Sequence, residues 1–336
     1  ASDGHWSLDL RKKYDQINID LLNQKVEIGA GVKMGTLIDE LSITGNSFPI
    51  GLSGETGLGY VLSGGISPIS RNQGLAIDQL IKIRGFWGSG ESFDISKPNS
   101  YSSLEERRAW RGLNGAAPFL AIITHLTLRI QKINPLYIYQ SVLTPDQLSE
   151  SIYQAEHWPN PASLQWIWGD EIKAYAVIEL DKSKEAKEAK NLLKDLPFYK
   201  EASSSIVEGI KDMPKFVLPI KNNNSFERQH SEVIGLLGED WGRQASALIK
   251  SINELMDNRP NRNCYIAAQQ LGGITKSRDT KESSFIYKDA SWKPWICGSW
   301  NKADLICKKN SLNWIEKLWE EMQPLCPGIH LAQMHQ

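Results

Sequence analysis

The chain has 336 residues, of which 38 are basic and 39 acidic, so its formal net charge is −1. This balance argues against a nucleic acid or an anionic membrane surface as partner. Hydrophobic residues make up 41% of the sequence, yet no stretch approaches 18 uncharged apolar residues, so we expect one to two globular domains and no transmembrane helix.

The four cysteines lie in the last quarter of the chain, at Cys264, Cys297, Cys307 and Cys326. Their spacing matches no metal site, so we predict no bound metal. Buried free thiols are favoured over a disulfide pair. The twelve tryptophans are expected mostly in the core, although sugar-binding clefts also use aromatic rings.

Short strands joined by turns dominate the first part of the chain. Val26, Ile28, Ala30 and Val32 alternate with polar or small residues, which is typical of a half-buried strand. Strands are expected at residues 6–10, 17–20, 25–32, 80–84, 93–95 and 121–130. Helices are expected around residues 37–41 and 104–110, with a glycine- and alanine-rich turn at 111–119.

The sequence changes character at Asn134-Pro135, after which it is more charged and mixes helices with strands. Helices are expected at residues 145–157, 183–196 and 310–322, with one or two more within 226–258. Strands are expected at residues 164–168, 172–180, 264–268, 284–288 and 295–300. The pattern predicts a mostly antiparallel first unit, residues 1–133, followed by an α+β unit, residues 134–336.

Residues 51–78, GLSGETGLGYVLSGGISPISRNQGLAID, form the most unusual stretch. Glycine raises the entropy that folding removes, so a loop this rich in glycine indicates positive φ angles or a backbone close to a ligand. The interspersed hydroxyl groups and the N–H groups of such turns suit phosphate or sugar oxygens. An ordinary glycine-rich surface loop is the alternative.

Several motifs resemble one family when they are taken together. They are VEIGAGVKMGTLIDEL, FPIGLSGETGLGYVLSGGISPISRNQGLAID, WRGLNGAAPFLAIITHLTLRI, QQLGGI and SSFIYKDASW, and they span most of residues 7–330. In this order the chain resembles the FAD-linked oxidoreductases of the vanillyl-alcohol oxidase and p-cresol methylhydroxylase superfamily. The branch that it resembles is the berberine-bridge-enzyme-like and hexose-oxidase-like one.

The resemblance implies an α+β fold in two parts. Residues 1–133 would form a partial FAD-binding domain of the p-cresol methylhydroxylase type, with the mostly antiparallel second subdomain present. The first subdomain would be missing from the chain, and we expect the true N-terminus to precede Ala1. Residues 134–336 would form a substrate domain with an antiparallel sheet flanked by helices, without the usual C-terminal segment that returns to the FAD domain.

The resemblance also implies which residues hold the cofactor. The FAD-binding positions carried over are Gly51, Ser53, Thr56, Gly57, Leu58, Gly59, Ser63, Gly64, Gly65, Ser70, Gly74, Asp78, Gly115, Ala117, Ile122 and Ile123. Ser53 lies where some relatives attach the flavin through cysteine, so a thioether is not expected. FAD would be non-covalent or tethered through a histidine outside this chain, because His5 fits a strand better than the tether position.

The activity implied is oxidation of an alcohol group on a small molecule, with a sugar as the favoured substrate. The candidate catalytic residues are His330, Gln270 and Tyr287, of which His330 would act as the base. An exposed terminal histidine, and core or surface roles for Gln270 and Tyr287, are alternatives. A second hypothesis is a family member that no longer binds FAD and acts as a binding or scaffold protein. The compartment stays open, with the cytoplasm slightly favoured, as do the oligomeric state and the choice between oxidase and dehydrogenase.

Overall fold

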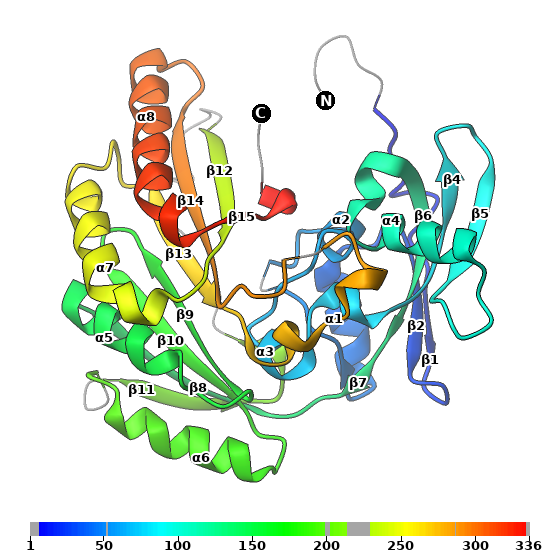
Figure 1. Cartoon of the computed structure of the whole chain (residues 1–336), viewed down its shortest axis with the longest axis horizontal. Coiled ribbons are helices and arrows are strands. Elements are labelled where there is room, and N and C mark those ends of the chain that lie inside the picture. Colours follow the sequence, from blue (N-terminus) through cyan, green and yellow to red (C-terminus); the bar gives the residue numbers. More distant parts are fainter. Residues whose placement is uncertain (1–6, 52, 199–201, 214–228, 286, 334–336) are drawn as a thin grey trace.

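The computed structural model describes residues 7–51, 53–198, 202–213, 229–285 and 287–333, and Figure 1 shows them as two units side by side. The first unit contains a five-stranded sheet in the order β1-β2-β6-β4-β5. Every neighbouring pair in it is antiparallel. Its strands are β1 (Ile17–Asp20), β2 (Lys25–Gly29), β4 (Leu80–Trp87), β5 (Ser92–Ser96) and β6 (Ala121–Arg129).

Four helices and a two-stranded ribbon complete the first unit. The helices are α1 (Met34–Ile43), α2 (Leu58–Leu62), α3 (Ser70–Gln73) and α4 (Leu104–Leu120), and the ribbon pairs β3 (Asn46–Ser47) with β7 (Gln131–Lys132). Helix α4 begins at a capping box, in which Ser103 accepts from the Glu106 N–H. It breaks at Asn114 and at Gly115, whose φ is +124°. The turn predicted at residues 111–119 is therefore mostly helical, and only its centre breaks the helix.

The second unit contains an eight-stranded sheet in the order β11-β8-β10-β9-β13-β14-β12-β15. All of its neighbouring strands are antiparallel. The strands are β8 (Leu136–Leu143), β9 (Ala162–Trp168), β10 (Ile172–Glu179), β11 (Ser203–Val207), β12 (Gln229–Leu237), β13 (Tyr265–Gln270), β14 (Trp292–Asn301) and β15 (Gly328–Ile329).

Helices cover one face of this sheet and leave the other face toward the first unit (Figure 1). They are α5 (Pro145–Ala155), α6 (Lys184–Leu192), α7 (Trp241–Asp257) and α8 (Leu305–Met322). Thr144 caps α5, with Pro145 in its first turn, as the Thr-Pro-Asp sequence predicts. The observed architecture confirms the predicted α+β class with antiparallel sheets.

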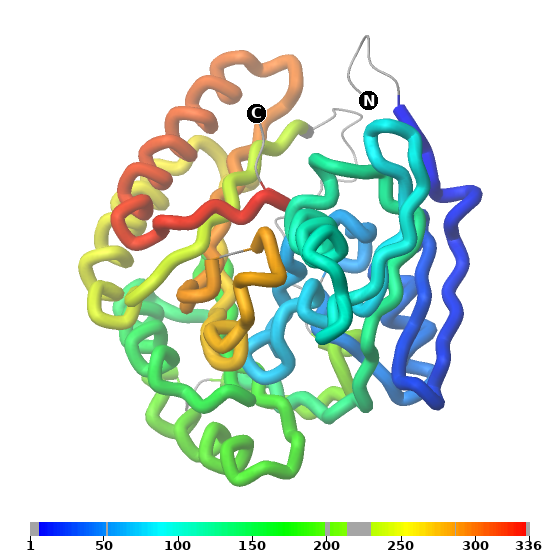
Figure 2. Tube along the Cα trace, turned by 45° about the vertical axis from the view of Figure 1, so that its right-hand side comes forward, coloured from blue at the N-terminus to red at the C-terminus, as the bar shows by residue number. Residues whose placement is uncertain are grey.

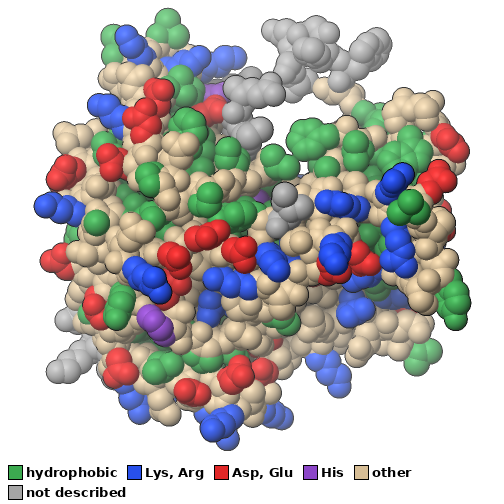
Figure 3. Space-filling view, in the orientation of Figure 1, with side chains coloured by type: hydrophobic (Ala, Val, Ile, Leu, Met, Phe, Trp, Pro, Cys, Tyr) green, Lys and Arg blue, Asp and Glu red, His purple; other side chains and the backbone are tan. Residues whose placement is uncertain are grey.

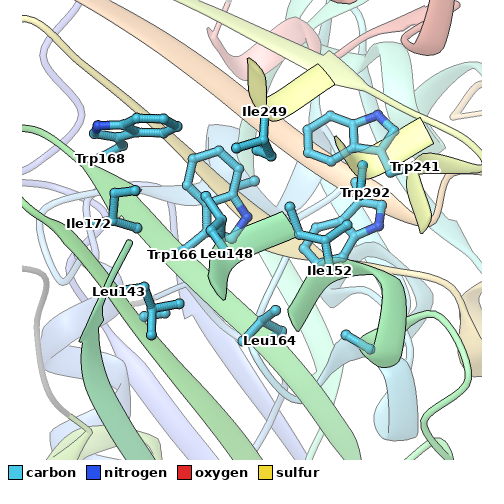
Figure 4. Close-up of a cluster of buried hydrophobic side chains, with 14 of the residues drawn as sticks. Leu143, Leu148, Ile152, Leu164, Trp166, Trp168, Ile172, Trp241, Ile249 and Trp292 are labelled. Atoms are coloured by element: carbon cyan, nitrogen blue, oxygen red, sulfur yellow. The ribbon is translucent and has the colours of Figure 1, made fainter. Parts of the chain in front are cut away.

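The core beneath the helices is rich in tryptophan (Figure 4). Trp166 from β9, Trp241 from α7 and Trp292 from β14 have no exposed surface. The rings of Trp241 and Trp292 stack with centroids 5.4 Å apart. Most of the tryptophans are therefore core residues, and their abundance gives little support to a sugar-binding cleft.

A second apolar cluster joins the two units. It contains Val26, Leu37 and Trp110 of the first unit, and also Tyr175 and Leu237 from the second sheet. The proposed boundary near residue 134 falls between β7 and β8, where the chain crosses from one sheet to the other. Because both units contribute to one core, the division into two domains at this boundary stays a prediction.

Three further expectations about secondary structure are wrong. Residues 7–10 form no strand, and the rest of that predicted strand lies outside the described residues, as does His5. The described part of 284–288 is a loop because Ser284 N–H donates to the Asn114 carbonyl of α4, 2.7 Å away, instead of to a strand. Strand β12 occupies part of the stretch where only helices were expected, because its backbone pairs with β14.

All four cysteines are free, and three of them are buried, as predicted. Within the described ranges, no helix combines the length and the apolar character that crossing a membrane requires.

Candidate functional site

The glycine-rich stretch lies at the junction of the two units and winds through the short helices α2 and α3. Gly64 and Gly65 have φ angles of +123° and +70°, which favour glycine. A Cβ on Gly65 would lie 2.4 Å from the Ala76 Cβ, so packing within the protein explains this glycine. A Cβ on Gly59 would meet no described atom within 4 Å. Gly59 therefore leaves open space over α2.

The sixteen predicted cofactor positions divide into two groups by exposure. Exposed or half-exposed are Gly51, Ser53, Thr56, Gly57, Gly59, Asp78 and Ile122. Buried are Leu58, Ser63, Gly64, Gly65, Ser70, Gly74, Gly115, Ala117 and Ile123. The exposed positions can contact a bound molecule directly. The buried positions could do so only through backbone atoms that border the site.

The end of the glycine-rich stretch already has protein partners. Ser70 has no exposed surface, and its hydroxyl accepts from the Ser67 N–H. The Asp78 carboxylate accepts from the Leu75 N–H and from Arg278, which lies in the loop that follows β13. The contacts of Ser70 and Asp78 thus account for both residues structurally, and cofactor binding by them stays a prediction.

Arg71 links this stretch to the second unit, and the sequence did not single it out. Its guanidinium donates to the carbonyl oxygens of Trp158, Ala162 and Leu271 at 2.6 to 2.7 Å. Burial lowers its pKa to about 10. Only 5% of Arg71 is exposed. The Ser-Arg-Asn-Gln motif therefore docks the two units and positions the glycines before it.

Phe285 closes the other side of the junction. A Cβ on Gly64 would lie 3.0 Å from the Phe285 ring, and one on Gly115 would lie 2.4 Å from the Phe285 nitrogen. Both glycines permit the loop 283–290 to lie against the first unit. The resemblance assigned Gly64 and Gly115 to the cofactor, whereas the structure shows that protein packing also requires them.

The first unit also exposes an apolar strip beside this junction. Phe119 is 70% exposed, and Phe86, Leu120 and Ile122 are each exposed by 40% to 47%. Phe86 and Ile122 are direct partners across β4 and β6. Figure 3 shows hydrophobic side chains gathered over α4 and β6. The strip therefore includes the predicted cofactor position Ile122 and adjoins Ile123.

The sheet face of the second unit that meets the first unit carries a row of polar side chains. Gln165 of β9 lies opposite Gln269 of β13, and Gln269 lies opposite Lys293 of β14. Directly opposed residues in an antiparallel sheet share a face. Burial lowers the pKa of Lys293 to about 7. Sequence patterns did not single out Gln165 or Lys293, because the face of each strand depends on its partners.

His330 joins this row from the segment after β15, which Figures 1 and 2 show crossing from the second unit toward the first. The exposed-histidine alternative is wrong, since only 1% of His330 is exposed. Burial lowers the pKa of His330 to about 3, and the charge of Lys293 adds to this effect, while the Ser63 backbone nearby opposes it. The imidazole is therefore neutral at ordinary pH.

Gln270 and Tyr287, the other catalytic candidates, lie elsewhere. Gln270 lies on the helix-covered face, where its side chain binds the Leu164 N–H and the Ala155 carbonyl. These contacts match the core role that the sequence left open. Tyr287 is half-buried and donates to the Glu239 carboxylate, and its pKa is raised first by burial and then by that carboxylate. Neither side chain lies in the polar row.

Comparisons with known proteins identify the fold. No protein-family model matches the sequence. The chain is 23% identical over 300 residues to the uncharacterized FAD-linked oxidoreductase YgaK of Bacillus subtilis (strain 168). That match covers 87% of this chain and 64% of YgaK, which is less than two thirds of its length. The solved structure of Physcomitrella patens BBE-like 1 matches with a TM-score of 0.76, over 95% of this chain and 71% of that one, at 16% identity.

The chain has the berberine-bridge-enzyme-like fold. The predicted resemblance to these FAD-linked oxidoreductases and the predicted fold class are therefore confirmed. The structure of chitooligosaccharide oxidase is also similar, with a TM-score of 0.74 and 13% identity, over 94% of this chain and 69% of that one. In the berberine-bridge-like fold of this chain, the glycine-rich stretch and the polar row face each other across the junction of the units.

Proposed function

We propose that the chain acts as an FAD-dependent oxidoreductase that oxidises an alcohol group of a small molecule. The observation that supports this proposal most directly is Gly59, which keeps space open over α2 that no described atom fills. Gly59 is exposed and lies within the motif that carries the family resemblance, so its backbone can lie against a bound molecule there. The FAD-linked relatives suggest that this molecule is FAD.

The residues at the junction suit the two ends of such a cofactor. The backbone of Gly57 and Gly59 and the Ser63 backbone would lie along its phosphates and ribityl chain. The apolar strip of Phe86, Phe119, Leu120 and Ile122 would lie beside its adenine end. The positions along the phosphates follow the family resemblance, and the position of the adenine end follows the exposed apolar side chains beside Ile122 and Ile123.

When bound, FAD would supply the electron acceptor for removal of a hydride from the carbon that bears the hydroxyl. The side chains of the polar row would position the substrate opposite the glycine-rich stretch. His330 would donate a hydrogen bond to the hydroxyl oxygen from the N–H of its buried, neutral imidazole. A pKa of about 3 opposes a second proton on this ring, so His330 would orient the alcohol, and the hydroxyl proton would pass to solvent as the hydride leaves.

Titration of FAD into the purified chain tests the proposal, with flavin fluorescence as the readout. Gly59→Leu places a side chain in the open space and should weaken FAD binding at least tenfold without lowering the melting temperature. Gly88→Leu is the matched control, since Gly88 also has no described neighbour within 4 Å and lies in the β4–β5 turn. It should bind FAD as the parent chain does.

A folded chain that takes up no FAD would contradict the proposal and favour the scaffold hypothesis. Equal FAD affinity of Gly59→Leu and Gly88→Leu would place the cofactor elsewhere. Loss of the visible flavin absorbance when alcohols are added under anaerobic conditions would then identify substrates, with sugars and hydroxy acids as the first two panels.

A further inference from the structure

The polar row contains a buried ammonium group without an anionic partner. Lys293 is 5% exposed. None of the ion pairs among the described residues includes it. Its Nζ lies 4.1 Å from the centre of the Trp295 ring, whose face attracts a cation without neutralising it. A buried charge in this state favours the arrival of an anion.

Gln165 provides a buried polar atom without a partner in the same row, and the network around it fixes its orientation. Ser163 Oγ donates to the Pro68 carbonyl at 2.5 Å. Since that hydroxyl has only one proton, it must accept from Gln165 Nε2, 2.8 Å away. The remaining atom, Gln165 Oε1, is buried without a partner. It can accept a hydrogen bond but cannot donate one.

His330 completes the set from the facing segment. Both of its ring nitrogens are buried, and neither forms a hydrogen bond of good geometry with the described residues, although the Ser63 backbone lies near enough to raise the pKa of the ring. Its ring centroid lies 6.4 Å from that of Phe285, the residue that packs against Gly64. The unsatisfied groups therefore gather where the sheet meets the glycine-rich stretch, since Ser163 binds Pro68 of that stretch.

Buried polar groups without partners are uncommon in folded proteins, and several of them in one place suit a bound water, ion or polar ligand. Lys293 requires an acceptor that carries negative charge, which a carboxylate provides. Gln165 Oε1 requires a donor, which a hydroxyl provides. Trp295 and Tyr265, both half-buried on this sheet face, add aromatic surface.

We propose that Gln165, Lys293 and His330 form a receptor for a hydroxy acid, in which Lys293 binds the carboxylate and Gln165 accepts from the hydroxyl. This inference rests on the proposed function, because it names the substrate class of the same site. It narrows the alcohol to one that carries an acidic group, and it disfavours a neutral sugar.

Three probes of nearly equal shape separate the contributions. Mandelate carries a carboxylate and a hydroxyl, mandelamide lacks the charge, and phenylacetate lacks the hydroxyl. We expect mandelate to bind the chain at pH 6 at least tenfold more tightly than either analogue, measured by calorimetry and by the shift in melting temperature. Lys293→Met should remove the preference for mandelate over mandelamide. Gln165→Leu should remove the preference for mandelate over phenylacetate.

Lys308→Met on α8 serves as the control, because Lys308 is an exposed lysine on the helix-covered side of the sheet. It should leave all three affinities unchanged. Equal binding of mandelate and mandelamide, or no binding of any probe at tens of millimolar, would overturn the proposal. So would an unchanged preference in a folded Lys293→Met variant.

A final comparison separates the substrate from the cofactor as the source of the anion. Mandelate should bind to the FAD-saturated chain at least as tightly as to the free chain. If FAD abolishes mandelate binding, Lys293 faces the cofactor and the hydroxy-acid proposal is overturned while the proposed function stands. If FAD does not bind but the mandelate preferences persist, the proposed function fails and the receptor remains.

Discussion

At Lys293, which is 5% exposed, an ammonium group lies on the sheet face toward the first unit. Its pKa of about 7 is well below the value of about 10.4 that an unfolded chain would show. His330 shows the same effect, with a folded pKa of about 3 against about 6.5 when unfolded. The fold therefore lowers the pKa of both side chains. A bound anion would raise the pKa of Lys293 again.

The lowered pKa of Lys293 should appear in the pH dependence of the free energy of unfolding. Between about pH 7 and pH 10 the unfolded chain binds more protons at position 293 than the folded chain, so the free energy of unfolding should rise with pH. In Lys293→Met this rise should disappear, and the variant should be more stable than the parent at pH 7 by on the order of 3 kcal/mol. Urea denaturation at several pH values measures both.

His330→Gln provides the companion measurement at acidic pH. The free energy of unfolding of the parent chain should also rise between about pH 3 and pH 6.5, because the folded imidazole resists protonation there. His330→Gln should remove this part of the rise. Parallel pH curves for the parent and both variants would show that neither group is desolvated as described.

At the scale of elements, α3 and the loop after β13 form the joint between the units. Arg71 extends from α3 to three carbonyl groups of the second unit. Gly273, at a φ of +59°, would place a Cβ 2.4 Å from the Arg71 carbonyl oxygen. Two motifs 200 residues apart, SRNQG and QQLGG, thus form one contact. The resemblance placed both motifs, but it could not show that they touch.

Replacement of Arg71 should therefore destabilise the whole chain. Arg71→Met leaves three buried carbonyl oxygens without donors, which we expect to cost about 3–5 kcal/mol of unfolding free energy. Arg71→Lys should retain part of this energy. Urea denaturation followed by tryptophan fluorescence is the measurement. The exposed Arg243 of α7 is the matched control, and Arg243→Met should change stability by less than about 0.5 kcal/mol; a similar loss at both sites would contradict the proposed joint.

Over the whole molecule, a shared core and a few buried polar contacts hold two antiparallel sheets together (Figure 2). The ion pair of Asp78 with Arg278 is one such contact, with side-chain exposures of 24% and 7%. Arg278 also donates to the Phe285 carbonyl, and so holds the loop that closes the junction. Charged side chains of both signs form a band across this face in Figure 3.

A double-mutant cycle measures how far this pair couples the units. Asp78→Asn and Arg278→Met should each destabilise the chain, and the double variant should lose about 1–3 kcal/mol less than the sum of the two. Chemical denaturation supplies the energies. An interaction energy near zero would mean that the apolar core alone holds the units together. Lys82 with Asp94, a more exposed pair within one hairpin, should give a coupling below about 1 kcal/mol.

Local signals in the sequence determined much of the fold. The alternation in β2 and β6 and the Thr-Pro start of α5 act over a few residues, and each has the predicted structure. Helix α4 instead continues through most of the predicted turn and breaks only at Asn114 and Gly115. The motif order carried the family resemblance, because the fold keeps those turns at fixed positions along the chain. Strand β12 was missed because its strand form depends on the pairing with β14, a partner far along the chain.

Only the tertiary structure decided which side chains face the junction. A strand shows alternate residues to opposite faces, so Gln269 and not Gln270 belongs to the polar row, and only the register with β9 and β14 reveals this. The burial of His330 could likewise not be predicted from the sequence, because it depends on how residues 328–333 fold back over β12. Composition and periodicity act locally, whereas a site formed between two sheets depends on distant contacts.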